Sequence, residues 1–149
     1  MAQPTIEQWA RQLIIKIEKV AEVAVEETVV ESAREMKTLI KTRGTDRQWS
    51  GYYIGRSGIP RNRSGRGRID SGNMLDSVSS QYILDVSNIK TGEFGWIKGD
   101  PENYFVKQEE GFYNQLSSSY IEPMNALRDS FTYATLTVVN KIKKGLSSI

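Results

Sequence analysis

The chain has 149 residues and a formal net charge of +2, with 38% hydrophobic and 26% charged residues. It contains neither cysteine nor histidine, which excludes disulfides, thiolate nucleophiles, cysteine-based zinc sites and histidine acid–base chemistry. The length suits one domain with one core.

No run of residues approaches the roughly 18 consecutive apolar positions that a membrane-spanning helix needs. The first twelve residues, MAQPTIEQWARQ, lack the basic segment and continuous apolar core of a secretory signal. We therefore expect a protein that neither enters a membrane nor is exported. The missing residue types also favour a protein that is not an enzyme and that binds no metal or cofactor.

The first predicted element is one long helix from Thr5 to Lys41. Thr5 and Gln8 form a capping-box pattern at its start. Apolar residues then recur every three or four positions, at Ile6, Trp9, Leu13, Ile17, Val20, Ala24, Val29, Ala33, Met36 and Ile40. Such a helix would span about 55 Å, more than one small domain needs, so part of it is expected to pack on a neighbouring chain.

The next segment, residues 42–69, is rich in glycine and arginine. Six glycines and Pro60 make a long helix or a continuous strand unfavourable, so we predict a loop. Its arginines are Arg43, Arg47, Arg56, Arg61, Arg63, Arg66 and Arg68. Against the single acid Asp46 they give residues 43–68 a charge of +6, which leaves −4 on the rest of the chain.

Residues 70–111 are predicted to form a short helix followed by antiparallel strands. A turn at residues 88–92 separates the first strand from a second at residues 93–98. Residues 104–110 could form a third strand or a short helical turn, and we expect a strand at the start. Pro123 is expected to open a C-terminal helix that runs to Gly145, with three lysines near its end. The predicted fold class is α+β.

The arginines admit three interpretations that the sequence does not separate. They could neutralise phosphates of DNA without reading its sequence, they could pair with carboxylates of a partner protein, or they could be solvated with no specific partner. Two other features carry no site. The glycines near Arg56 and Arg66 do not match a phosphate-binding loop, and neighbouring glutamates at 109 and 110 would point to opposite faces of a strand.

Three stretches together resemble the small head–tail joining (neck or tail-completion) family of tailed bacteriophages. The first is R-I-D-S-G-N-M-L-D-S-V, residues 68–78, similar to the family pattern D-T-G-x-L-x-x-S-I/V. The second is Y-F-V-K-Q-E-E-G, residues 104–111, similar to Y-A-x-x-x-E-x-G. The third, residues 121–128, is similar to P-x-x-x-L-R-x-A. The matching positions, in family order, are Asp70, Gly72, Leu75, Tyr104, Glu109, Gly111, Pro123, Leu127 and Arg128.

The resemblance implies a structural virion protein that assembles in the host cytoplasm into a homo-oligomeric ring of six or twelve copies. The ring would surround the DNA channel at the neck, between the portal or adaptor and the tail tube. It could be a tail terminator, a head-completion protein or a connector. Our hypothesis is that the axial DNA, or the next protein ring, is contacted by five arginines: Arg56, Arg61, Arg63, Arg66 and Arg68. The alternative is a nucleic-acid-binding module that acts through these arginines.

Overall fold

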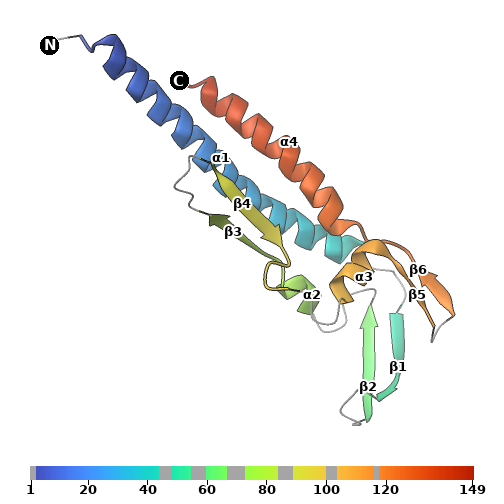
Figure 1. Ribbon diagram of the computed structural model, residues 1–149. Coiled ribbons are helices and arrows are strands. Elements are labelled where there is room, and N and C mark those ends of the chain that lie inside the picture. The colour runs from blue at the N-terminus through green and yellow to red at the C-terminus, as the bar shows by residue number, and fades with distance from the viewer. Residues whose placement is uncertain are drawn as a thin grey trace.

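The computed structural model describes residues 3–43, 48–54, 60–66, 73–83, 89–99, 104–115 and 118–149. Their elements, in chain order, are α1 (Ile6–Thr42), β1 (Gln48–Ile54), β2 (Pro60–Arg66), α2 (Asn73–Asp76), β3 (Ser79–Ile83), β4 (Thr91–Gly95), α3 (Tyr104–Glu110), β5 (Phe112–Asn114), β6 (Ser119–Ile121) and α4 (Ala126–Leu146). This order confirms the α+β class (Figure 1).

The long helix α1 begins with the predicted capping box. The Thr5 backbone N–H donates to Gln8 Oε1 (3.0 Å), and the Gln8 N–H donates to Thr5 Oγ1 (3.2 Å). Every buried residue of α1 lies in its second half, between Ala24 and Ile40. No residue of α1 before Ala24 is buried.

Helix α4 packs antiparallel along the second half of α1, so both chain termini lie at the same end of the molecule (Figure 1). Small side chains allow this approach: Ala24, Thr28 and Ser32 are buried on α1, and Ser130 and Ala134 on α4. At 21 residues α4 is about 32 Å long. It ends beside Val20, whose Cγ1 would lie 2.5 Å from a Cβ on Gly145.

The strands that the structure describes form three separate two-stranded antiparallel pairs: β1 with β2, β3 with β4, and β5 with β6. The β3–β4 pair packs against α1. Gly92 of β4 sits directly on Val25 and Val29, and a Cβ there would overlap Val29 Cγ1. Glycine is needed at this position because the strand backbone touches the helix side chains.

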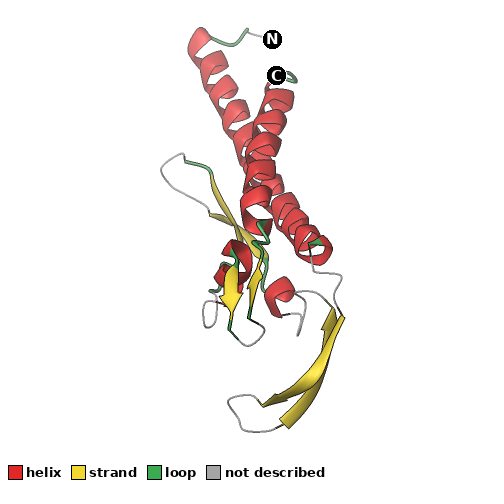
Figure 2. Cartoon of the chain, turned by 90° about the vertical axis from the view of Figure 1, so that its right-hand side faces the viewer, coloured by secondary structure: helices red, strands yellow, loops and turns green. Residues whose placement is uncertain are grey.

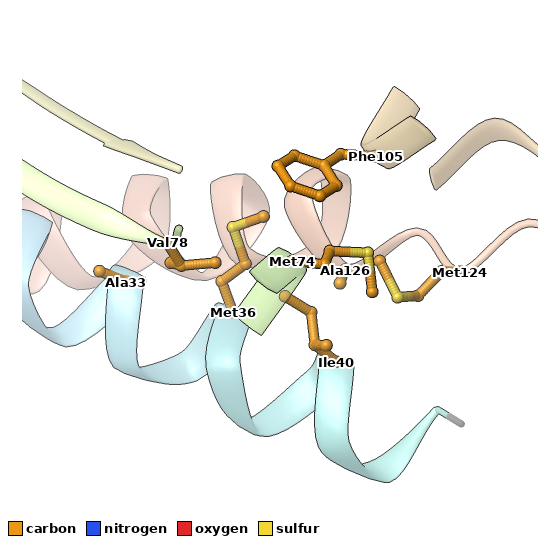
Figure 3. Close-up of a cluster of buried hydrophobic side chains, with 8 residues drawn as sticks. All are labelled: Ala33, Met36, Ile40, Met74, Val78, Phe105, Met124 and Ala126. Atoms are coloured by element: carbon orange, nitrogen blue, oxygen red, sulfur yellow. The ribbon is translucent and has the colours of Figure 1, made fainter. Parts of the chain in front are cut away.

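The core lies where α1, α2, α3 and the start of α4 meet (Figure 3). Its side chains are Ala33, Met36, Ile40, Met74, Val78, Phe105, Met124 and Ala126. Trp96 closes one side with its ring 5.3 Å from that of Phe105, and its indole N–H donates to the Met74 carbonyl (2.9 Å). Three methionines in so small a core suit an irregular junction, because their unbranched side chains fill uneven gaps.

The prediction of a loop over the whole arginine-rich segment, residues 42–69, was wrong. Its described residues form β1 and β2, paired from Gln48 opposite Arg66 to Ile54 opposite Pro60. We call this two-stranded ribbon the arm, and it projects from the end of the molecule opposite the termini (Figure 2). Glycines 51 and 65 do not prevent pairing, since the backbone alone makes the ladder hydrogen bonds.

Three smaller predictions were also wrong. Residues 104–110 form the helix α3 and not a strand, because no helix breaker occurs before Gly111, which ends it at φ +82°. The C-terminal helix begins at Ala126, three residues after Pro123, and Gly145 lies within its last turn. The second strand of the central pair spans residues 91–95 and not 93–98.

Gly145→Ala tests the close approach of α4 to α1. Alanine is the better helix former by about 1 kcal/mol, yet its Cβ would meet the stiff side chain of Val20. We expect Gly145→Ala to lower the free energy of unfolding in the wild type and to raise it in a Val20→Ala background. Urea unfolding of the four variants measures this, and stabilisation in both backgrounds would contradict the contact.

Candidate functional site

The start of α4 is capped by a residue from another element. The N-cap residue Asn125 is left-handed (φ 52°, ψ 27°) and makes no side-chain capping bond. The Glu109 carboxylate of α3 takes that role: Oε2 accepts from the Ala126 N–H (2.9 Å) and Oε1 from the Arg128 N–H (3.0 Å). A carboxylate here satisfies two otherwise unpaired donors and complements the positive end of the helix dipole.

The backbone of α3 holds the same segment from its C-terminal end. The Met124 N–H donates to the Gln108 carbonyl (2.9 Å) and the Asn125 N–H to the Glu109 carbonyl (3.2 Å). Gly111 follows with positive φ, and a Cβ there would lie 2.8 Å from the Ile121 carbonyl oxygen. The end of α3 and the start of α4 therefore cap each other.

Arg43, at the C-terminal end of α1, is the third part of this arrangement. Its Nη1 donates to the carbonyl oxygens of Met124 and Asn125 (3.1 Å each) and to Asp129 Oδ2 (2.6 Å). One guanidinium thus joins α1 to the segment before α4 and to its first turn. We call Arg43, Glu109, the residues 124–126 and Asp129 the α4 junction.

Asp129 is the acidic centre of the α4 junction. Hydrogen bonds from the Arg43 guanidinium, and then from Arg128 Nε (2.9 Å), hold the pKa of this carboxyl below its usual value. Its side chain is about one third exposed, with a relative accessibility of 32%, so solvent screens the pairing.

A second ionic contact joins the helices further along. Lys141 Nζ of α4 lies 2.8 Å from Glu27 Oε2 and 2.9 Å from Glu31 Oε1 of α1. Hydrogen bonds to Glu27, and then to Glu31, raise the pKa of the Lys141 amine. This contact flanks the buried small side chains and fixes the register of α4 on α1.

The five arginines singled out in the sequence are not all visible. Arg56 and Arg68 lie outside the described residues, as do Asp70 and Gly72. Arg61, Arg63 and Arg66 belong to β2, where they pair with Tyr53, Gly51 and Gln48. The arm therefore carries three arginines and no acid along its two strands.

The remaining motif positions converge on the core and the α4 junction. Leu75 and Leu127 pack against the core, and Glu109, Gly111, Pro123 and Arg128 lie at or next to the α4 junction. Tyr104 opens α3 and meets Phe105 edge to face, with ring centroids 6.2 Å apart. The expectation that Glu109 lies on a strand and belongs to no site was wrong, because residues 104–110 form a helix that aims its carboxylate at α4.

An apolar hollow of ≈ 480 Å³ lies beside these residues, lined chiefly by Phe94, Trp96, Val106, Leu127 and Phe131. Glu93 is the single charged side chain among its lining residues. In the part of the chain that the structure describes, no three acidic side chains gather as metal ligands would. None of the helices there is both long and apolar enough to cross a bilayer.

Two junction residues were missed by sequence reasoning. Arg43 had been counted only as part of the basic segment, and Asp129 had not been singled out. Their separation of 86 positions leaves no local signal of the pairing. A sequence clue does exist for Glu109, since Asn125 and the apolar residues after it offer α4 no capping box of its own.

Comparisons with protein-family models, with curated proteins and with solved structures gave no significant match.

Glu109→Ala tests the cap. It leaves the N–H groups of Ala126 and Arg128 without their acceptor, and we expect it to lower the free energy of unfolding by about 1–2 kcal/mol. The matched control is Glu110→Ala, the exposed neighbour, which should stay within about 0.5 kcal/mol of the wild type. Equal effects of the two substitutions in denaturant unfolding would contradict the capping role.

Asp129→Asn tests the ionic centre of the α4 junction. Because the folded pKa is lowered, the stabilisation is fully present above the unfolded value of about 3.9 and is lost as pH falls through the folded pKa. Asp129→Asn should therefore be less stable than the wild type at pH 7, with a difference that shrinks below about pH 4. In an Arg43→Met background the effect at pH 7 should largely disappear. A difference independent of pH and of Arg43 would disprove the pairing.

Proposed function

We propose that the chain is a structural virion protein of a tailed bacteriophage that assembles into a homo-oligomeric ring at the head–tail neck, around the DNA channel. The observation that carries the proposal is the convergence of motif positions. Glu109, Gly111, Pro123, Leu127 and Arg128 come from two separate motifs, and they meet at the start of α4. Residues that match the family pattern are thus also the residues that hold the start of α4 in place.

The exposed apolar surface supports assembly into a larger particle. On the outer side of α4, Phe131 and Leu136 are 65% and 64% exposed, and Val139 is 43% exposed. Each described strand belongs to a two-stranded pair and so has one unpaired edge. A ring needs head-to-tail contacts between two different surfaces, and the outer side of α4 and the unpaired strand edges could supply them.

The arm supports a contact with a negatively charged partner. It projects from the molecule and carries Arg61, Arg63 and Arg66, while the chain outside residues 43–68 has a charge of −4. In a ring, an arm of this kind would reach the axial DNA or the carboxylates of the next ring. The same arm is what favours the alternative, a module that binds nucleic acid as a single chain.

Replacing five arginines by serine tests the assignment of the contact: Arg56, Arg61, Arg63, Arg66 and Arg68. In a phage that carries the chain, we expect the variant to give particles that fail to join or that lose DNA. The matched control replaces five exposed lysines of the helices: Lys16, Lys41, Lys107, Lys143 and Lys144. Normal titre and DNA retention in the arginine variant would overturn the assignment of these residues.

The function itself is tested on the purified protein by light scattering and negative-stain imaging, alone and with tail-tube or portal particles. Rings, or added mass at one end of those particles, are the expected result. A single chain that attaches to neither particle, but binds DNA with an affinity that falls steeply with salt, would reject the ring and favour the nucleic-acid module.

A further inference from the structure

The face of α1 that packs on α4 continues beyond the end of α4. Helical spacing places Ile6, Leu13 and Ile17 on the same face as Ala24 and Thr28, which are buried against α4. Trp9 and Ile14 flank them. We call Ile6, Trp9, Leu13, Ile14 and Ile17 the α1 stripe. Because α4 ends beside Val20, none of the described residues covers it.

The α1 stripe is unusually apolar for an uncovered surface. Ile6, Trp9, Ile14 and Ile17 are 86%, 57%, 54% and 42% exposed. At roughly 200 Å² for a large side chain, these four leave about 450 Å² of each chain in water. The same face in the second half of the helix is buried, so the stripe continues an interface that already exists within the chain.

We propose that the α1 stripe is a homodimer interface, in which two copies pair antiparallel through residues 6–17. The spacing of Ile6, Ala10, Leu13 and Ile17 is four, three and four. It reads the same in both directions, so a two-fold axis near residues 11 and 12 sets Ile6 against Ile17 of the second copy. Two copies would bury about 900 Å² from these four side chains, just below the roughly 1,000 Å² that a biological interface should exceed. Leu13, Ala10 and the side-chain stems of the flanking polar residues add to that area.

The position of α4 decides the orientation. In a parallel pair, the α4 helices of the two copies would have to occupy the same space, because each lies on the same face of α1 between Val20 and Ile40. An antiparallel copy runs away from that space, and its α1 begins where α4 ends. The C-terminal end of α4, with its negative partial charge, then faces the positive N-terminal end of the second copy's α1.

This dimer goes beyond the ring of the proposed function and does not depend on it. A two-fold contact closes on two copies, whereas a ring requires a head-to-tail contact. The dimer would therefore cover the α1 stripe whether or not the chain also forms a ring.

Ile6→Glu/Ile17→Glu tests the interface by sedimentation equilibrium. The wild type should have twice the chain mass of 16.9 kDa, and the double variant should be a monomer, with a dissociation constant raised at least about 100-fold. The control is Ile15→Glu, which lies in the same turns on the opposite face and is 64% exposed. It should remain a dimer. Far-ultraviolet circular dichroism should show equal helix content in all three proteins.

A distance measurement tests the orientation. The chain has no cysteine, so Glu26→Cys gives a single site for a nitroxide label. Antiparallel pairing about residues 11 and 12 sets the two labels about 45 Å apart along the helix axis, whereas a parallel pair would hold them within about 30 Å. A monomeric wild type, a complex unchanged by Ile6→Glu/Ile17→Glu, or a short label distance would each overturn the proposal. So would a single chain that associates only when tail-tube particles are added.

Discussion

The first turn of α4 depends on residues that lie far away in the sequence. A helix begins with backbone N–H groups that have no partner inside it, and here Glu109 accepts from two of them while Arg43 binds the carbonyls just before the helix. The three helices are thereby joined at one place. Met124 and Ala126, which lie in that segment, are nearly free of solvent contact, so the polar junction and the apolar core position each other.

The distribution of burial along α1 follows from this arrangement. The α4 junction anchors α4 near Ile40, and α4 is 16 residues shorter than α1. It therefore covers only the second half of its partner. Small residues in that half let the two helices pack closely. Two of them bury hydroxyl groups, Thr28 Oγ1 and Ser32 Oγ, that have no hydrogen-bond partner among the described residues. Unpaired buried hydroxyls destabilise the folded state, whereas the ion pairs of Lys141 beside them stabilise it.

Local signals in the sequence predicted those elements whose structure is local. The capping box at Thr5 and the three- and four-residue spacing specified α1, and turn residues separated β3 from β4. Residues 104–110 were misread because a seven-residue apolar and polar mixture fits either a strand or a helix, and Gly111 decides between them. Glu109 then lay on the wrong element, so its capping contact with α4 could not be inferred.

The arm and the contacts of Arg43 were beyond local reasoning for a different reason. Glycines disfavour a strand only through chain entropy and lost packing, and pairing of Gln48–Ile54 with Pro60–Arg66 depends on a partner that composition does not reveal. Likewise the ion pair of Arg43 with Asp129 exists because α4 returns along α1. Charge counting located the basic segment. It could not distinguish Arg43, at the edge of that segment, which joins α1 to α4, from the arginines on the arm.

The same helix hairpin leaves two kinds of apolar surface that differ in symmetry. The α1 stripe can pair with itself, because its spacing is the same from either end. The outer face of α4, with Phe131 and Leu136, has no such match and suits a contact with a different surface of a neighbour. Closed rings are built from contacts of the second kind and two-fold dimers from the first. If both operate in one protein, forming the ring need not open the dimer, and the two-fold contact would then join rings back to back.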